Sequence, residues 1–147
     1  MSKANSNFDH LVKDEYGDKK PKGTYHAINK LEERIIELGA ENVAAFIGEP
    51  IQGAGGVIIP PDNYWPRIQE ICKKYDILLV VDEVICGFGR TGNLWGCETY
   101  NIKPDIIISS KCLTAGYFPM GAVIVKKEFA DEFTSISEEA EEFPHGF

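Results

Sequence analysis

The run ILLVVDEV at residues 77–84 decides the fold that this sequence predicts. It opens with five apolar residues, too short a run for a helix and suited to a strand buried on both faces. The acidic residues Asp82 and Glu83 then end the apolar run. An earlier apolar run, VAAFI at residues 43–47, stops at Gly48 and predicts a second buried strand.

The segment between these two runs predicts a helix. Asp62 or Asn63 can cap its start, and apolar side chains recur along it at three- and four-residue steps. These side chains are Trp65, Ile68, Cys72 and Tyr75. Strand, helix and strand in this order form a β-α-β unit, in which the strands are parallel and the crossover is right-handed.

The sequence after this unit extends the sheet. Apolar runs at residues 105–109 (DIIIS) and 121–125 (GAVIV) predict two further strands, and an acidic helix is expected from about Lys127 onward. Strands that alternate with helices are typical of an α/β fold. We therefore expect a mostly parallel sheet with flanking helices.

The sequence before the unit divides into two parts. Residues 1–23 are charged and show no sustained period, which predicts an irregular arm. From there, apolar residues at helical spacing predict an amphipathic helix with Thr24 as its N-cap and Gly39 at its end. The α/β part accordingly runs over residues 24–147.

Composition excludes several classes of function. The chain has 147 residues and a net charge of −8, and no basic patch is available for nucleic-acid phosphates. Its four cysteines lack CxxC spacing, so the sequence encodes neither a zinc knuckle nor a redox pair, and no metal is expected. No apolar run approaches the length of a membrane span or a signal peptide. These features predict a soluble, cytoplasmic protein with reduced thiols and with neither nucleic acid nor membrane as a partner.

Charged residues follow the predicted strands at one edge of the sheet. Glu49 follows the first strand, Asp82 and Glu83 follow the second, and Lys111 follows the third. Ligands of such sheets bind at the carboxyl ends of the strands. Each residue alone is more simply explained as a charge that leaves the sheet for solvent, or as an ion pair that closes a loop. Together they predict a ligand site, because a buried lone charge is costly unless it is paired or used.

The residue types at this edge suit pyridoxal phosphate. A lysine amine forms a Schiff base with a carbonyl cofactor, and the pyridine nitrogen of this cofactor needs an acid that keeps it protonated. Lys111 and Asp82 are the right types on adjacent strand ends. The released lysine would then serve as the base that moves a proton between substrate and cofactor carbons.

A second motif matches the fingerprint of a nicotinamide-binding site only in part. The hexapeptide GFGRTG at residues 87–92 matches GxGxxG, but no long helix is expected after it, and position 112, where an acidic residue belongs, is Cys112. A glycine-rich turn without phosphate fits better. Within this turn, Arg90 is expected to pair with a carboxylate, with a substrate-binding role as the alternative.

Three linked motifs carry a resemblance to a known family. They are EPIQGAGGVIIPP at residues 49–61, LLVVDEVICGFGRTG at 78–92 and PDIIISSKCLTAGYFPMGAVIV at 104–125. In order and spacing they resemble the central part of the class III aminotransferases, in the subgroup II, ω-amino acid:pyruvate type. The resemblance implies part of the large domain of a fold-type I (aspartate aminotransferase-like) pyridoxal-phosphate enzyme, which works as a homodimer with its active site at the subunit interface.

The resemblance also implies a role for each matching residue. Lys111 matches the Schiff-base lysine, and Asp82 matches the partner of the pyridinium nitrogen. Val84 matches a residue that lies against one face of the cofactor ring. Glu49 matches the glutamate that, in many members, pairs with a mobile arginine and switches between amine and keto-acid substrates.

Two residues depart from the family pattern. Ile85 stands where many members have a glutamine that contacts the phenolic oxygen of the cofactor, and this apolar variant resembles the branch that uses pyruvate with ω-amino acids, diamines or simple amines. Cys112 replaces the small residue that usually follows the lysine, and we expect a small buried apolar side chain rather than a catalytic thiol.

Other residues of the motifs are expected to shape loops. Gly53, Gly55 and Gly56 are expected to permit a loop conformation that a Cβ atom would forbid. Gln52 either faces the site or makes a loop hydrogen bond. The segment YFPM at residues 117–120 either lines a pocket or lies in the dimer interface.

Three features that are typical of the family are not matched by this sequence. The family's phosphate-binding turn, its second ring-stacking residue and its C-terminal domain have no counterpart here. We therefore expect a large domain truncated at both ends, which alone binds the cofactor weakly and is weakly active or inactive. Two functions stay open: an aminotransferase that moves an amino group from an ω-amino acid, diamine or amine to a keto acid, with pyruvate expected, or a non-catalytic α/β binding or assembly module derived from such an enzyme.

Overall fold

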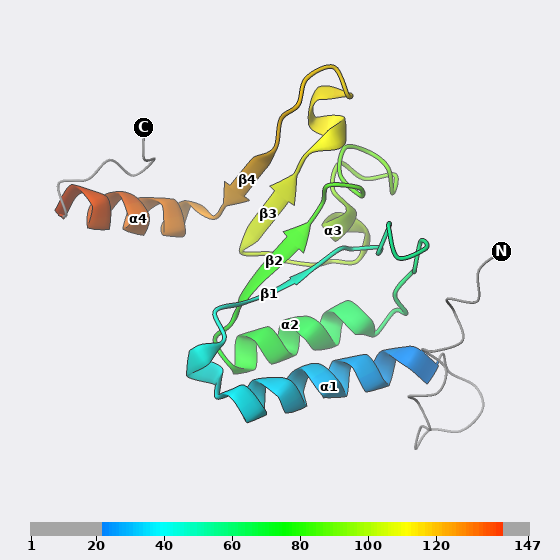
Figure 1. The fold of residues 1–147 in the computed structure, drawn as a ribbon, viewed down its shortest axis with the longest axis vertical. Coiled ribbons are helices and arrows are strands. Elements are labelled where there is room, and N and C mark those ends of the chain that lie inside the picture. Colours follow the sequence, from blue (N-terminus) through cyan, green and yellow to red (C-terminus); the bar gives the residue numbers. More distant parts are fainter. Residues whose placement is uncertain (1–21, 140–147) are drawn as a thin grey trace.

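The computed structural model describes residues 22–139 of the chain. The helices are α1 (Lys22–Leu38), α2 (Tyr64–Lys74), α3 (Gly96–Thr99) and α4 (Lys127–Glu139), with 3-10 turns η3 (Ala40–Asn42) and η4 (Lys111–Thr114). The strands are β1 (Ala45–Gly48), β2 (Leu78–Asp82), β3 (Ile106–Ser109) and β4 (Ala122–Val125). Figure 1 shows the strands side by side, with α1 and α2 together near one end of the sheet.

The four strands form one sheet in the order β1-β2-β3-β4. β1 and β2 are parallel, β2 and β3 are parallel, and β4 returns antiparallel to β3. The parallel β-α-β unit and the mostly parallel α/β sheet predicted from the sequence are therefore confirmed. Each of the first two strands begins one or two residues later than its apolar run and ends one residue later.

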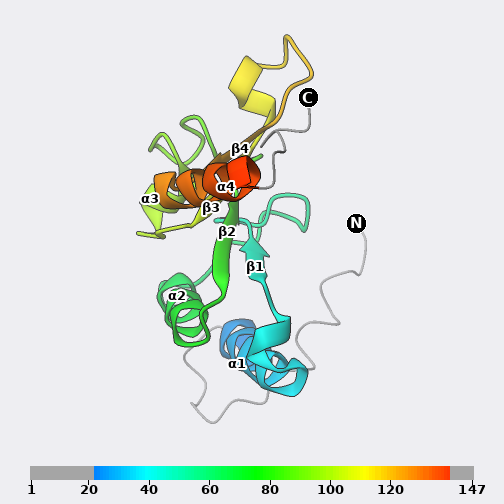
Figure 2. The ribbon, with the colours of Figure 1, turned by 90° about the vertical axis from the view of Figure 1, so that its left-hand side faces the viewer.

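The core lies between α2 and one face of the sheet. Trp65 and Ile68 of α2 are each 1% exposed and belong to the same buried cluster as Leu79 and Val81 of β2. This confirms the apolar helix face expected from the sequence. α1 packs mainly on α2, and Figure 2 shows the two helices beside each other below the strands.

The other face of the sheet carries exposed apolar side chains, and we call it the open face. By strand register it holds Ile47, Val80, Ile106, Ile108, Val123 and Val125. Ile47 is 57% exposed and Val123 is 67% exposed. The expectation that residues 43–47 form a strand buried on both faces is therefore wrong. β1 is an edge strand, and only one of its faces packs on α2 within the described residues.

The start of α1 also differs from the expectation. The helix begins at Lys22, so Thr24 lies inside it rather than at its N-cap, and the predicted arm ends before Gly23. Most of that arm, like the predicted end of the domain, lies outside the described residues. Across residues 22–139, no helix combines the length and the apolar character that a membrane crossing requires.

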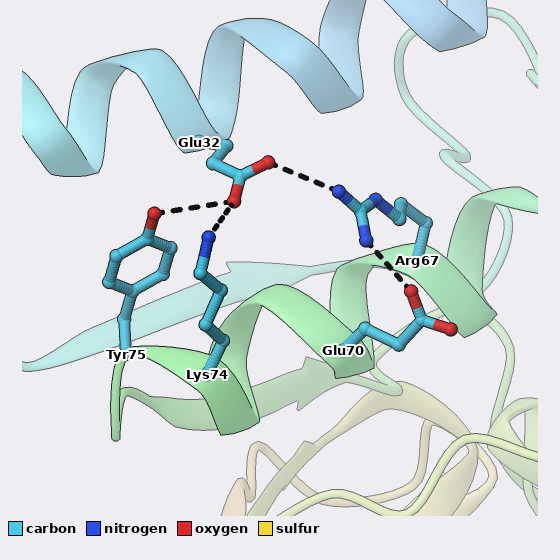
Figure 3. Close-up of polar contacts among 5 residues, drawn as sticks. All are labelled: Glu32, Arg67, Glu70, Lys74 and Tyr75. Atoms are coloured by element: carbon cyan, nitrogen blue, oxygen red, sulfur yellow. Dashed lines mark hydrogen bonds and ion pairs between the residues drawn. The ribbon is translucent and has the colours of Figure 1, made fainter.

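A polar network joins α1 to α2 across their outer side (Figure 3). The Glu32 carboxylate of α1 accepts hydrogen bonds from Lys74 Nζ at 2.8 Å, Arg67 Nη2 at 3.2 Å and the Tyr75 hydroxyl at 3.2 Å. Arg67 also donates to Glu70 at 2.9 Å. The hydrogen bond from Lys74 is the main cause that lowers the pKa of Glu32 below its ordinary value. The Glu32 side chain, only 20% exposed, thus accepts hydrogen bonds from two residues of α2 and from Tyr75, the C-cap of α2.

This network predicts a stability effect that depends on pH. Glu32→Gln should lower the free energy of unfolding by about 1 kcal/mol at pH 7, because a neutral amide loses its charge-assisted hydrogen bonds. The pKa of Glu32 is lower in the folded chain, so its contribution is present at neutral pH and is lost as the pH falls below the ordinary value of 4.5. Urea unfolding of both proteins at pH 7 and pH 3 measures the difference.

Glu33→Gln is the matched control, because Glu33 pairs with Lys30 within α1 and 64% of its side chain is exposed. It should change stability by less than about 0.5 kcal/mol at either pH. Equal effects of the two substitutions at pH 7 would contradict the role of Glu32.

Candidate active site

The predicted site residues sit at one edge of the sheet. Gly48 pairs in register with Val81, and Asp82 pairs with Ile108, so Glu49 and Asp82 leave neighbouring parallel strands at the same level. Lys111 follows β3 three residues after Ile108. The topology therefore brings the backbones of Glu49, Asp82 and Lys111 to one edge, as expected. Among the described residues, no hydrogen bond or ion pair uses the Lys111 side chain.

The Asp82 side chain is oriented by its own turn. Its Oδ1 accepts a hydrogen bond from the Val84 backbone N–H at 2.9 Å, and the residue is half-buried. Aspartate commonly makes this bond to the backbone two residues on. The second oxygen, Oδ2, accepts no hydrogen bond from any described residue, so it remains available to a ligand. Val84 itself is half-buried beside it.

Lys111 has an unusual backbone conformation. Its φ angle is +45°, in the left-handed region that side chains other than glycine rarely adopt. The turn around it is closed by the Leu113 N–H, which donates to Ser110 O at 3.0 Å, and by the Ser110 hydroxyl, which donates to Met120 O at 2.9 Å. The side chain is exposed. Backbone strain of this kind is concentrated at functional sites.

Glu83 is the one acidic residue of this edge that faces the core. It is 0% exposed, and its carboxylate accepts hydrogen bonds from the backbone N–H groups of Gly96 at 2.9 Å and Cys97 at 2.6 Å. It therefore fixes the start of α3 to the end of β2. The expectation that Glu83 is one of the ligand-binding charges is therefore wrong within the described residues. The strand period carried the signal, because neighbours in a strand point to opposite faces.

The hydrogen bonds of the Glu83 carboxylate predict that a conservative substitution at this residue destabilises the fold strongly. Glu83→Gln should lower the free energy of unfolding by about 2 kcal/mol, because the amide has one acceptor oxygen for two buried N–H donors. Glu98→Gln is the matched control, because the exposed Glu98 of α3 accepts one hydrogen bond, from the N–H of the N-cap residue Trp95, and the amide keeps an oxygen for that single bond. It should cost less than about 0.5 kcal/mol. Thermal unfolding of both variants measures the two effects, and similar melting temperatures would contradict the assignment.

Glu49 is tied to the loop that follows β1. Its Oε2 accepts a hydrogen bond from the Gly53 N–H at 2.8 Å, which leaves Glu49 half-buried. A Cβ atom on Gly53 would lie 2.4 Å from Ile85 Cδ1, so glycine allows this loop to pack against the loop after β2. Gly56 has a φ angle of +111°, which confirms a backbone need for glycine there. Gln52 pairs with Ile58 through its backbone in the same loop.

Arg90 links two segments of the site. Its Nε donates to Ile85 O at 2.5 Å, and its Nη2 donates to Cys112 Sγ at 3.4 Å. The expectation of an ion pair at Arg90 is wrong within the described residues, because a carbonyl and a sulfur occupy its donors instead of a carboxylate. Cys112 is half-buried, not buried as expected. The motif around Arg90 forms a turn, with Gly89 at a φ angle of +90°.

The remaining cysteines are buried thiols. Burial raises the pKa of Cys72 to about 11 and that of Cys97 to about 12, with the nearby carboxylates of Asp105 and Glu83 as secondary causes. Burial also raises the pKa of Cys86. A thiol is a nucleophile only as a thiolate, so none of the three suits nucleophilic chemistry.

Comparison with known proteins decides the family. The family described as "Aminotransferase class-III" matches residues 3–146. The chain belongs to the class III aminotransferases. Among curated class III relatives, putrescine--pyruvate aminotransferase from Pseudomonas aeruginosa is 57% identical over 121 residues, which cover 82% of this chain. Gamma aminobutyrate transaminase 3, chloroplastic, from Solanum lycopersicum is 55% identical over 119 residues, 81% of this chain. The chain spans about a quarter of these relatives, 26% and 23% of their lengths.

Solved aminotransferase structures share the fold. An omega-aminotransferase from Paracoccus denitrificans superposes with a TM-score of 0.79 and 51% identity, over 90% of this chain and 30% of that chain. An omega-transferase from Vibrio fluvialis gives a TM-score of 0.79 and 52% identity, over 90% of this chain and 32% of that chain. The expected α/β transaminase fold is confirmed.

The edge residues of this class III chain fit pyridoxal phosphate, the cofactor of the family. Lys111 presents an exposed primary amine that can bind an aldehyde. Asp82 presents an oriented carboxylate with a free oxygen on the adjacent strand end. Within residues 22–139, no group of three or more His, Cys, Asp or Glu side chains could hold a metal ion.

Proposed function

We propose that this chain forms the cofactor-attachment part of a pyridoxal-phosphate-dependent aminotransferase. One observation carries the proposal. Lys111 and Asp82 leave two adjacent parallel strands at the same edge, with the lysine amine exposed and the aspartate held by its own turn. An amine and a carboxylate in this arrangement suit the two ends of a pyridoxal ring.

The roles of the individual residues follow from their chemistry. Pyridoxal phosphate, when bound, supplies an electron sink for the carbanion formed during amino-group transfer. Lys111 would hold the cofactor through Nζ and, when free, would take and return a proton at that nitrogen. Asp82 would keep the proton on the pyridine nitrogen by charge pairing, which would raise the pKa of that nitrogen. By the family resemblance, Val84 would lie against one face of the ring, and Glu49 would pair with a cation near the substrate.

The substrates we propose are an amine donor and a keto-acid acceptor. The names of the relatives include putrescine with pyruvate, and gamma aminobutyrate. Both named amines carry a primary amine at the end of a short carbon chain. We therefore propose a donor with a terminal primary amine and pyruvate as the acceptor, in agreement with the apolar Ile85 near Val84.

We also propose that the enzyme is a homodimer. The segment after Lys111 exposes large apolar side chains, with Tyr117 93% exposed and Phe118 62% exposed. Large exposed apolar side chains beside a site are typical of an interface. This exposure supports a role for the segment in the subunit interface rather than in a closed pocket.

Covalent trapping tests the attachment site. The purified chain is mixed with pyridoxal phosphate and reduced with borohydride, and the labelled peptides are mapped by mass spectrometry. We expect Lys111 to be labelled at least about tenfold faster than the exposed Lys127, whose amine pairs with Asp131, because a built site binds the cofactor before the amine reacts. Labelling at Lys111 no faster than at Lys127 would favour the non-catalytic module.

Two aspartate variants separate a specific site from general reactivity. Asp82→Asn should slow labelling at Lys111 several-fold, because the ring nitrogen loses its charged partner. Asp76→Asn is the matched control, since Asp76 precedes β2 at the opposite edge and its φ angle of +53° suits asparagine. It should leave labelling at Lys111 unchanged.

A segment exchange tests the activity and the substrates. The 121 residues of this chain that align with the Pseudomonas aeruginosa putrescine--pyruvate aminotransferase at 57% identity replace the matching segment of that enzyme. We expect the chimera to form alanine from putrescine and pyruvate within about tenfold of the parent rate, and Lys111→Ala in it to lose at least about 10³-fold, because the covalent route is removed. A folded dimeric chimera that is inactive would contradict the proposed function.

A further inference from the structure

We propose that Arg90 is a positioning residue that clamps the Lys111 turn onto the loop after β2. This inference rests on the proposed function, because it concerns the residue that would attach the cofactor. It gives Arg90 a role other than a surface ion pair or a substrate-binding cation. The role follows from the contacts on both sides of the guanidinium.

The Lys111 turn is held mostly by contacts within itself. The Ala115 N–H donates to Cys112 O at 3.1 Å, and the Thr114 hydroxyl donates to Phe118 O at 2.6 Å. Two of its residues, Lys111 and Ala115, have positive φ angles of +45° and +51°. Such a conformation persists only when the surroundings hold it. Among the described residues, the hydrogen bond that joins residues 110–121 to the loop after β2 is the one from Arg90 to Cys112.

The guanidinium of Arg90 spans the gap between two backbone segments. Nε donates to Ile85 O at 2.5 Å, and Nη2 donates to Cys112 Sγ at 3.4 Å. Because the guanidinium is planar and its donors point in fixed directions, these two contacts set the distance between the two segments. A lysine carries its donors on a single nitrogen and cannot make both contacts with the same geometry.

The loop that carries Arg90 is itself anchored to the core. The Gly87 N–H donates to Glu83 O at 2.9 Å, and the Phe88 N–H donates to Leu94 O at 2.6 Å. The Phe88 ring packs on Trp95, with ring centroids 5.1 Å apart. Arg90 therefore connects this anchored loop to Cys112, the residue next to Lys111.

The same loop contacts the segment that carries Glu49. Ile85 packs against Gly53, where a Cβ atom would meet Ile85 Cδ1 at 2.4 Å, and the Gly53 N–H donates to Glu49. Ile85 thus touches the Glu49 loop through its side chain and Arg90 through its carbonyl. Contacts of described residues connect Glu49, the loop after Asp82 and the Lys111 turn in one continuous path.

The contact is too weak to govern global stability. Arg90 is exposed, and sulfur is a weak hydrogen-bond acceptor. Its effect should appear as local opening of the Lys111 turn, which costs less free energy than global unfolding. The expected signature of a clamp is therefore a faster local exchange with an unchanged melting temperature.

Hydrogen exchange of the 147-residue chain without cofactor tests the clamp. The probes are the Leu113 and Ala115 amides, whose bonds close the turn. Arg90→Ala should raise both exchange rates about fivefold, and Arg90→Lys should do the same because the second contact is lost. Unchanged rates in Arg90→Ala would overturn the proposal.

Variants of Cys112 separate the contact from other effects of Arg90. Cys112→Ala should raise the same rates as much as Arg90→Ala, and the double variant should not exceed either single one, because both remove one interaction. Cys112→Ser keeps an acceptor and should exchange like the unsubstituted chain. Arg34→Ala is the control, since Arg34 pairs with Glu37 within α1. Additive rates in the double variant would overturn the proposal.

A second readout links the clamp to Lys111 and separates it from the proposed function. In borohydride trapping, Arg90→Ala should lower the labelling rate at Lys111 about fivefold while the rate at Lys127 and the melting temperature stay unchanged. If the exchange effects are found but the chimera described above is folded, dimeric and inactive, the proposed function fails and the clamp stands. If the unsubstituted chain is labelled and Arg90→Ala is labelled equally, the clamp has no positioning role.

Discussion

The buried carboxylate of Glu83 is the interaction on which the site edge depends. A charge with no exposure is tolerated only when its oxygens are fully hydrogen-bonded, and here both are bonded to the start of α3. The backbone of the same residue donates to Ile108 O at 2.8 Å and accepts from the Gly87 N–H at 2.9 Å. One residue therefore joins β2, β3, α3 and the glycine-rich turn. The geometry of the neighbouring Asp82 follows from these four bonds.

The alternation of side chains along a strand places the adjacent acids Asp82 and Glu83 on opposite faces of the sheet. Glu83 points to the face that packs on α2, and Asp82 points to the open face with Val80 and Ile108. Both carboxylate oxygens of Glu83 accept hydrogen bonds from within the fold, whereas Asp82 Oδ2 accepts none from the described residues. Two chemically similar neighbours in the sequence thus differ in their hydrogen bonds because their side chains lie on opposite faces of the sheet.

The strands and the ligand edge could be predicted from the sequence because they depend on local patterns. The runs at 77–81 and 105–109 are apolar without interruption, and charges follow them directly. The burial of β1 could not be predicted, because a short apolar run does not show whether its strand is central or at an edge. The partners of the Glu83 carboxylate, and the Cys112 partner of Arg90, lie 13 to 22 residues away along the chain, and no local period encodes such contacts. The roles of Lys111, Asp82, Val84 and Glu49 stay predictions.

The left-handed backbone conformation of Lys111 lowers the stability of the fold at the residue that we propose attaches the cofactor. A lysine in this region costs about 1 kcal/mol relative to a residue that adopts it freely. Glycine or asparagine at this position would relax the backbone and would remove the amine at the same time. Selection for stability alone would therefore discard the lysine. Under the proposed function, Lys111 would keep its amine at a cost in stability.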